Sequence, residues 1–303
     1  MRSREPLLGT RATAAVAGVP AAVAERVELA MFDSAARLES IFTVFDEGSG
    51  LHAFRRMGTT DVPELIEVLA SAERWVAETG GAFCPTMAPL MQLWAEAEAR
   101  DVRPTAAELA AATAAAQAGR PEHLDLNAVA KGWIADRAVA DALSILTEAT
   151  AEAVSETQAD GTQDPGVPTA WLSLGGDLVH RGSGTVAVGI EDPRRPYDNV
   201  PPLATIEVAN EAVATSGGGR RWWTIDGVRH SRVVDPRTGE PTHTMLSATV
   251  VASTAAVADV LATTALILGP DDAGDLVGRE GGEFLFVLTD GSVAASSGRF
   301  RRG

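Results

Sequence analysis

The chain has 303 residues, a length that suits one large domain or two small ones. Its single cysteine, Cys84, excludes an intrachain disulfide and a cysteine-rich zinc cluster. The net charge of −16 argues against nonspecific binding to nucleic acid or to an anionic membrane, and any anionic ligand would need a local positive pocket. Charge or glycine interrupts each apolar run well short of the roughly 18 residues that a membrane span requires, so no membrane insertion is expected.

The basic residues are almost all arginine. Of the 25 lysines and arginines, 24 are arginine, and the only lysine is Lys131. An ammonium and a guanidinium are not equivalent at a phosphate site. Composition therefore leaves two interpretations open, which are sequence drift and a requirement for an ammonium at this position.

The first ten residues contain charges and no apolar segment of signal-peptide length, so the expected location is the cytoplasm. Beyond them, apolar spacings of three and four and a high alanine content are typical of helices. Helices are predicted over 22–45, 61–77, 105–118, 128–146 and 255–268. Asp61 is expected to cap the second of these, and Thr79-Gly80-Gly81 is expected to end it.

Residues 148–168 are acidic, polar and interrupted by glycine and proline, which predicts a mobile loop or a disordered insertion. The chain then changes to short β-rich runs bounded by glycine. Strands are predicted over 171–174, 185–190, 204–208, 222–225, 246–252 and 283–288. Because helices come first and strands follow without regular alternation, the predicted fold class is α+β.

Two segments of the helical half have residue types that suit a ligand site. Thr79–Thr86 has paired glycines before an X-Pro step, so its backbone can approach a ligand closely, or it can simply end a helix and turn. Asp125 can cap a helix that carries Lys131 near its start, and such a helix start attracts phosphate. The alternative is an amphipathic helix with a lysine that faces solvent.

The strand half contains similar glycine-containing segments. Ser173–Leu178 fits a strand, a tight turn and a second strand, either as a plain hairpin or as a close backbone approach to a ligand. Val213–Gly217 is a second segment of this kind. The adjacent Arg220–Trp223 run can stack on an aromatic ligand or form a strand edge.

A carboxylate and a hydroxyl lie one turn apart in the last predicted helix. Asp259 and Thr263 share one face of it and can offer hard oxygen ligands to Mg²⁺. The alternative is an exposed polar face, which the apolar residues around them disfavour. Shortly before this helix, Asp235–Gly239 reads as a turn whose side chains and amides can bind oxyanions.

Common catalytic patterns are missing from the sequence. The five histidines have no metal-binding spacing such as HExxH, and no nucleophile triad is evident. A GxGxxG motif after a predicted strand is also missing, so a Rossmann-type nucleotide site is not expected.

Taken in order, the motifs GGAFCPT, DLNAVAKGWIAD, LGGDL, ATSG, DPRTG and ADVLATT resemble those of the ApbE family, the FAD:protein FMN transferases. The resemblance extends from about Gly9 to Gly291. It implies a T-fold-like α+β fold with a mixed or antiparallel sheet. It also implies a single flavin transferase domain over 6–300, with the mobile insertion at 148–168.

The resemblance implies that the protein binds FAD and Mg²⁺, moves the FMN half of FAD onto a threonine of a partner flavoprotein, and releases AMP. By motif, Asp259, Thr263 and the carbonyl of Ala128 correspond to the metal ligands. Catalytic roles fall to Lys131, Arg232 and Asp259. The implied FAD contacts are Leu8, Phe45, Ala82, Phe83, Cys84, Asp125, Lys131 and Arg232.

The chain departs from the family pattern at four positions. Where the family usually has histidine, this chain has Arg232, which can hold phosphate but cannot take up a proton near neutral pH. His230 lies two residues away and would share that face of a strand. The other departures are Arg55 for asparagine, Cys84 for aspartate and Gly219 for an aromatic residue. Two alternatives to transfer therefore stay open, which are FAD binding with weak or lost transfer, and FAD pyrophosphatase activity.

Overall fold

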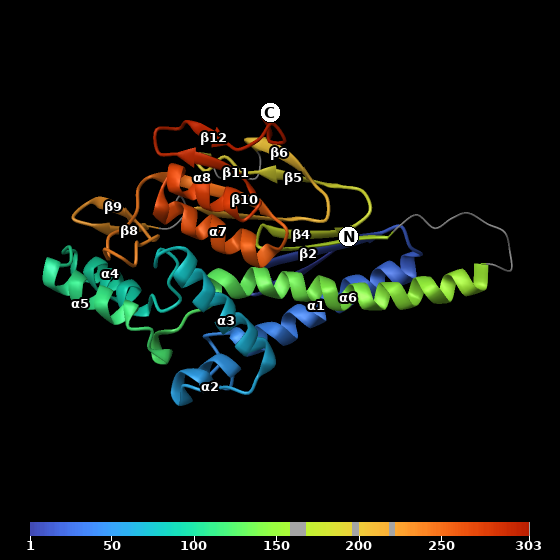
Figure 1. Ribbon diagram of the computed structural model, residues 1–303, viewed down its shortest axis with the longest axis horizontal. Coiled ribbons are helices and arrows are strands. Elements are labelled where there is room, and N and C mark those ends of the chain that lie inside the picture. The colour runs from blue at the N-terminus through green and yellow to red at the C-terminus, as the bar shows by residue number, and fades with distance from the viewer. Residues whose placement is uncertain (158–167, 196–199, 218–221, 303) are drawn as a thin grey trace.

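Helices cover one face of a large antiparallel β-sheet, and a small sheet covers the other face (Figure 1). The computed structural model describes residues 1–157, 168–195, 200–217 and 222–302. Its helices are α1 (Ala21–Phe42), α2 (Gly50–Met57), α3 (Pro63–Glu78), α4 (Ala88–Arg100), α5 (Ala106–Gln117), the 3-10 turn η1 (Pro121–His123), α6 (Asn127–Thr157), α7 (Ala255–Leu268) and α8 (Pro270–Arg279). Its strands are β1 (Arg2–Leu7), β2 (Thr10–Ala17), β3 (Thr169–Leu174), β4 (Asp177–Gly182), β5 (Val186–Ile190), β6 (Ala204–Val208), β7 (Ala212–Gly217), β8 (Trp222–Ile225), β9 (Val228–Ser231), β10 (Met245–Ala252), β11 (Glu283–Leu288), β12 (Val293–Ala295) and β13 (Arg301–Arg302).

The large sheet has the strand order β1-β2-β3-β4-β7-β10-β11-β12 among the described residues, and its neighbouring strands run antiparallel. β5, β6 and β13 form the small sheet, and β8 and β9 form a separate hairpin. The α+β fold class is thus confirmed. No helix within the described ranges is long and apolar enough to cross a membrane.

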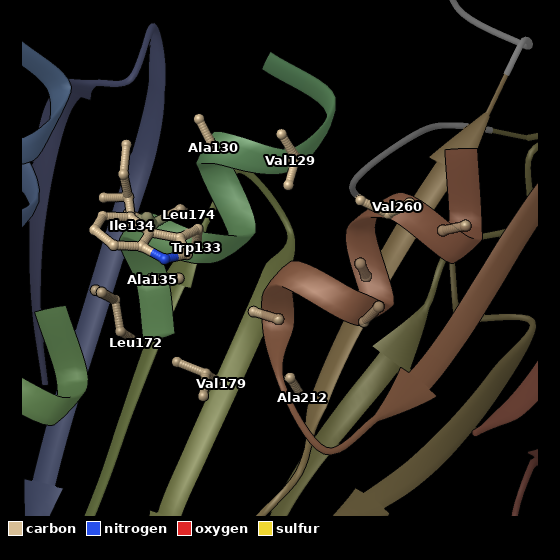
Figure 2. Packing of buried hydrophobic residues seen from close by; sticks show 14 of the residues in the cluster. Val129, Ala130, Trp133, Ile134, Ala135, Leu172, Leu174, Val179, Ala212 and Val260 are labelled. Atoms are coloured by element: carbon tan, nitrogen blue, oxygen red, sulfur yellow. The ribbon is translucent and has the colours of Figure 1, made fainter. Parts of the chain in front are cut away.

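The main hydrophobic core lies between the helical layer and the large sheet. Figure 2 shows Trp133 and Ile134 of α6 above Leu172 of β3 and Val179 of β4. A second core fills the space between the large and small sheets, and a third joins α4 and α5 to the β8–β9 hairpin. Since α6 and α7 both pack on the same sheet face, their side chains can meet at its surface.

The predicted elements agree with the structure in type at most places. The alanine-rich helix is α5, and Thr105 forms a capping box with Glu108 at its start. The prediction that Asp61 caps the helix over 61–77 was wrong, because this helix, α3, begins at Pro63 after Val62 and has no side-chain cap. Proline at the start of a helix needs no partner for a backbone N–H, which removes one of the groups that a cap would satisfy.

The helix that carries the lysine is longer than predicted. α6 continues beyond Leu146 to Thr157, so its last turns cover the first part of the segment predicted as an insertion. The rest of that segment, 158–167, lies outside the described residues. The first glycine or proline after Leu146 is Gly161, so the sequence contains no strong helix breaker before it.

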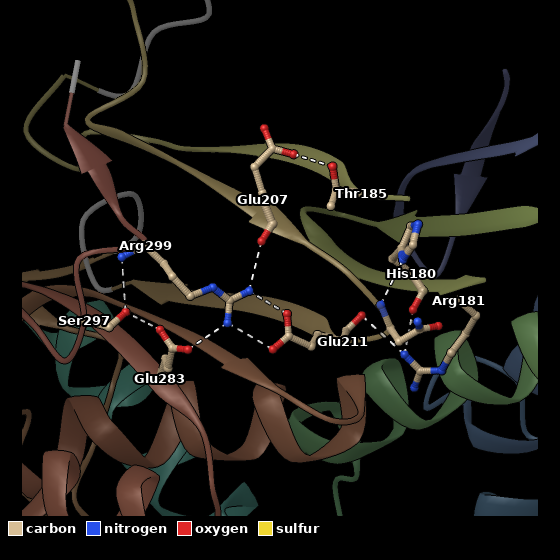
Figure 3. Close-up of polar contacts among 9 residues, drawn as sticks. His180, Arg181, Thr185, Glu207, Glu211, Glu283, Ser297 and Arg299 are labelled. Atoms are coloured by element: carbon tan, nitrogen blue, oxygen red, sulfur yellow. Dashed lines mark hydrogen bonds and ion pairs between the residues drawn. The ribbon is translucent and has the colours of Figure 1, made fainter. Parts of the chain in front are cut away.

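The C-terminal segment is attached to the rest of the fold by an ion-pair network (Figure 3). The guanidinium of Arg299 donates to Glu211 at 2.6 Å, just before β7, and to Glu283 at 2.7 Å, at the start of β11. Ser297 donates to the other oxygen of Glu283. The two carboxylates hold the pKa of Arg299 above its usual value.

Replacing this arginine should weaken the C-terminal attachment. Arg299→Met leaves two carboxylates facing each other without their shared cation. We expect the free energy of unfolding to fall by about 1–2 kcal/mol, a modest value because the network is partly exposed. Urea denaturation measures this change. Arg301→Met makes the same charge change on an exposed side chain of the same segment and should cost less than about 0.5 kcal/mol; equal losses in the two variants would contradict a specific role for Arg299.

Candidate functional site

The only lysine stands between two buried carboxylates where α6, β4 and α7 meet. Lys131 Nζ lies 2.5 Å from Asp177 Oδ2 and 3.9 Å from Asp259 Oδ1. Asp177 and Asp259 are only 2% and 3% exposed, whereas the lysine side chain is 31% exposed. With all three groups ionised, the cluster carries a net charge of −1, and both of its carboxylates are almost fully buried.

Two residues that follow the lysine on α6 fix this helix against α7. A Cβ atom on Gly132 would lie 2.3 Å from the backbone oxygen of Ala255, so only glycine permits this close approach. One turn later, the carboxylate of Asp136 accepts hydrogen bonds from the backbone N–H groups of Ala255 and Ala256, both at 2.9 Å. Asp136 therefore satisfies free donors at the start of α7 and sets its position, which brings Asp259 toward the lysine.

A tight turn places the second carboxylate. Gly175 and Gly176 connect β3 to β4 with φ of 63° and 102°, backbone values that favour glycine. A Cβ on Gly175 would lie 2.8 Å from the Thr10 hydroxyl. Asp177 follows this turn directly, and its Oδ1 accepts a hydrogen bond from the backbone N–H of Thr215 at 3.4 Å. The predicted strand–turn–strand passage is thus a hairpin that delivers a carboxylate to the lysine.

The predicted metal ligands offer oxygen atoms of the kinds that a divalent cation such as Mg²⁺ binds. Asp259 Oδ2 is buried and accepts no hydrogen bond from any residue of the described ranges. Thr263, one turn further along α7, exchanges a hydrogen bond of 2.8 Å with Ser216 of β7. Ala128, whose carbonyl is the third predicted ligand, lies in the first turn of α6. Carboxylate, hydroxyl and carbonyl oxygens are the ligands that Mg²⁺ prefers.

Burial and mutual repulsion shape the charges of the cluster. Burial is the main cause that raises the pKa of Asp259, to about 8; Lys131 acts against this rise and Asp177 adds to it. Burial also raises the pKa of Asp177. For Lys131, burial opposes the charged form, but Asp259 and Asp177 outweigh it and hold the pKa of the ammonium above its usual value. Lys131 is therefore firmly charged, and Asp259, with a pKa of about 8, mostly holds a proton near neutral pH unless a further cation compensates its charge.

A cavity of about 740 Å³ opens beside the lysine. It lies between the β1–β2 turn, the end of α1 and the start of α6, and Lys131 forms part of its wall. Two predicted FAD contacts line it: Leu8, in the β1–β2 turn, and Phe45, which is 95% exposed at its rim. Further polar lining comes from Glu39 and Asn127.

A second cavity of about 540 Å³ adjoins the Thr79–Thr86 loop and is mainly apolar. Phe83 and Cys84 line it, while Ala82 is fully buried and is not among its lining residues. Arg237 contributes a charged side chain to its wall. The structure thus assigns two of the three predicted contacts of this loop to an open cavity.

The chain segment that contains Asp125 joins the two cavities. Leu124 lines the apolar cavity and Asn127 lines the cavity beside the lysine. Asp125 itself donates its backbone N–H to the carbonyl of Pro85 at 2.6 Å and accepts the N–H of Asn127 on its carboxylate at 2.9 Å. Arg55, one of the departures from the family pattern, donates to the Leu124 carbonyl at 2.9 Å and so holds the segment from the other side.

Arg232 occupies a different environment from the lysine. Its guanidinium lies 5.6 Å from the ring centre of Trp223 and 3.9 Å from a carboxylate oxygen of Glu98, and it is not among the residues that line either cavity. His230 is buried in the same lobe, with its ring 5.4 Å from that of Trp94, and burial lowers its pKa. The sequence predicted that Arg232 and Lys131 bind phosphate together. In the folded chain Arg232 contacts Trp223 and Glu98, whereas Lys131 lines the cavity of about 740 Å³.

The Asp235–Gly239 turn is stabilised from within. Arg237 donates to both oxygens of Asp235, at 2.9 and 2.7 Å. The same sequence, Asp-Pro-Arg, gives the same bidentate pair between Arg194 and Asp192, at 2.8 and 2.9 Å, in the segment after β5. Because the pairing recurs in a segment that lines neither cavity, the motif is first of all a self-contained turn.

Comparisons with known proteins agree with these features. The sequence model of the ApbE family matches residues 8–286. The FAD:protein FMN transferase of Klebsiella pneumoniae (strain 342) is 28% identical over 294 residues, covering 94% of this chain and 83% of its own length. That of Vibrio cholerae (strain O395) is 31% identical over 228 residues, covering 69% of this chain and 62% of its own length.

Solved structures share the fold. The ApbE protein of Thermotoga maritima superposes with a TM-score of 0.76 at 24% identity and covers 98% of this chain and 97% of its own. The flavinyl transferase ApbE of Pseudomonas stutzeri gives a TM-score of 0.70 at 22% identity, with coverage of 98% and 95%.

The contact at Gly132 can be tested by adding one methyl group. Gly132→Ala forces α6 away from α7, so we expect the free energy of unfolding to fall by about 1–3 kcal/mol. Gly278→Ala is the matched control, because a Cβ there meets open space on α8 and should be neutral or stabilising by up to about 1 kcal/mol. Urea titrations of both variants measure these changes. A Gly132 variant as stable as the Gly278 variant would show that the two helices can separate at no cost.

Proposed function

Because this chain belongs to the ApbE family, we propose that it is an FAD:protein FMN transferase that moves the FMN half of FAD onto a threonine of a partner flavoprotein and releases AMP. The observation that supports this most directly is the position of Lys131. Its ammonium lies between two buried carboxylates and lines a cavity of about 740 Å³. A dinucleotide in that cavity would bring its pyrophosphate next to the cluster.

The reaction is the attack of a hydroxyl on a pyrophosphate. The threonine oxygen forms a bond to the phosphorus of the FMN half, the bond from that phosphorus to the bridging oxygen breaks so that AMP leaves with this oxygen, and the hydroxyl proton passes to solvent. A Mg²⁺ held by Asp259 and Thr263, with the Ala128 carbonyl, would supply positive charge to the phosphate oxygens. Lys131 would bind a further phosphate oxygen from the cavity wall.

The proposed flavin contacts distribute FAD over both cavities. Leu8 and Phe45 would contact it beside the lysine, and Phe83 and Cys84 would contact it in the apolar cavity. Asp125 would lie between these two parts, on the segment that joins them. The charge of −16 makes the local cation essential, because the protein as a whole repels a pyrophosphate.

The test uses purified protein with FAD, MgCl₂ and a candidate flavoprotein domain, beside the same domain with its acceptor threonine changed to valine. We expect the threonine domain to gain the mass of FMN and an equal amount of AMP to appear. AMP with free FMN would instead indicate a pyrophosphatase, and intact bound FAD would indicate a binding protein. Either result, obtained with a domain that a known family member does modify, would overturn the transferase proposal.

The metal assignment predicts the behaviour of one conservative variant. Asp259→Asn keeps the size of the side chain and removes the charge that would hold Mg²⁺, so the transfer rate should fall at least about 100-fold. AMP release followed by chromatography measures the rate. Asp141→Asn, at a half-buried position of α6 that contacts Ser34 of α1, makes the same charge change away from the cluster and should retain most of the wild-type rate. A fully active Asp259 variant would refute its role as a ligand.

Binding of FAD should separate the two predicted phosphate-binding cations. Lys131→Met removes a charge from the cavity wall and should weaken FAD binding about tenfold or more. Arg232→Met should change the Kd less than about threefold, because the guanidinium rests on Trp223. Quenching of flavin fluorescence gives both constants. A larger loss for the Arg232 variant would assign the phosphate contact to that residue after all.

A further inference from the structure

Asp177 has no place in the ligand set carried over from the family motifs, yet it makes the shortest contact of the lysine. Its Oδ2 lies 2.5 Å from Lys131 Nζ, and its Oδ1 takes a weak hydrogen bond of 3.4 Å from Thr215. It is 2% exposed, which makes it as buried as Asp259. A buried carboxylate is rarely kept without a charged or metal partner.

The numbers of charges in the cluster do not balance. Two buried carboxylates share one ammonium, and Asp259 Oδ2 has no hydrogen-bond donor among the described residues. Pairing of Lys131 with Asp177 leaves the charge of Asp259 to be compensated either by a proton or by a second cation. A second cation beside Asp177 and Asp259 would balance the charges of both acids.

The ammonium and a divalent cation compete for the same carboxylate oxygens. A metal bound to both carboxylates would lie within a few ångströms of the present position of Lys131 Nζ, since metal–oxygen distances are about 2 Å. Two positive groups at that separation in a buried place repel each other strongly. The lysine has an open direction to move, because it is 31% exposed and lines the 740 Å³ cavity.

We propose that Asp177 and Asp259 form one carboxylate pair that accepts either the Lys131 ammonium or a divalent cation, and that entry of the metal drives the ammonium into the neighbouring cavity. This proposal deepens the proposed function, since the released ammonium then faces the place assigned to the pyrophosphate. Asp177 is on this view a positioning residue for the lysine and a ligand or near neighbour of the metal. Metal binding and presentation of the lysine to phosphate become a single event.

The first experiment uses the fact that the chain has a single lysine. Mild acylation with acetic anhydride modifies Lys131 and the α-amino group, and mass spectrometry of peptides measures the two rates separately. We expect MgCl₂, without FAD, to accelerate acylation of Lys131 at least about fivefold and to leave the α-amino group unaffected. Unchanged or slower acylation of Lys131 with saturating Mg²⁺ would overturn the proposal.

The second experiment measures the affinity for Mn²⁺ alone by electron paramagnetic resonance. Lys131→Met removes the competing cation and should tighten Mn²⁺ binding at least about tenfold, whereas Asp177→Asn should weaken it at least about tenfold. Lys131→Arg keeps a cation and should bind Mn²⁺ no more tightly than the wild type. Asp141→Asn, ten residues further along α6 and about 15 Å away along the helix axis, is the charge-matched control and should bind Mn²⁺ as the wild type does.

These outcomes separate the present proposal from the transferase proposal, because neither measurement contains FAD or an acceptor. Unchanged Mn²⁺ affinity in Asp177→Asn, or weaker affinity in Lys131→Met, would overturn the exchange of cations even if flavin transfer is observed. Should Lys131→Met fail to fold, the acylation rates of the wild-type protein and the Mn²⁺ affinity of Asp177→Asn still decide. In Asp177→Asn, faster acylation of Lys131 without metal is expected, and an unchanged rate would count against the proposal.

Discussion

The close contact between α6 and the start of α7 is the constraint on which the site depends. Glycine at position 132 lets the two helix backbones approach, and Asp136 supplies the hydrogen bonds that hold the first turn of α7 in place. Lys131 directly precedes this contact, and Asp259 lies one turn into the helix that the contact orients. One short segment of α6 therefore contains Lys131 and also Gly132 and Asp136, the two residues that position Asp259 near this lysine.

The large sheet supplies the other half of the site by a different physical means. Its hairpin between β3 and β4 turns through two glycines with positive φ, and the first polar residue after the turn is Asp177. Antiparallel pairing fixes which residues of β4 and β7 face the helices, so Asp177 and Ser216 both lie toward the helical layer. Helix packing positions Lys131 and Asp259, and strand register positions Asp177. Together they form a small polar cluster in an otherwise apolar interface.

Local sequence patterns predicted the parts of this arrangement that depend on local structure. The spacing of Asp259 and Thr263 predicted their common face on a helix, and the glycine pair predicted the hairpin before Asp177. The meeting of Lys131 with Asp177 could not be predicted, because it depends on how α6 lies across β4, and no local pattern encodes that distance. The LGGDL motif did contain a signal, since an acid directly after a ligand-approach turn is a candidate for a charge partner.

The position of Arg232 in the fold could not be predicted from its motif either. Its place in the sequence, just before the Asp-Pro-Arg-Thr-Gly turn, associated it with the phosphate-binding residues. In the folded chain its guanidinium rests against Trp223 beside Glu98, in the lobe made by α4, α5 and the β8–β9 hairpin. Aromatic packing and a local carboxylate determine where this side chain lies, and neither is visible from the motif. A sequence motif can indicate which residue types belong to a site, but the packing of the folded chain decides where each side chain lies.

The choice of lysine at position 131, in a chain that otherwise uses arginine, has a physical explanation in this cluster. A guanidinium is planar and carries five donors, so between two carboxylates it would make bidentate contacts and hold both acids permanently. An ammonium is a compact charge on a flexible four-carbon stem, and it can withdraw along that stem without changing the helix that carries it. Arginine suits the turns at Asp192 and Asp235, where the ion pair between arginine and aspartate stabilises the turn and does not have to open. Lysine suits a position where the cation must both bind a carboxylate pair and leave it. Position 131 is the only one in the sequence that has a lysine.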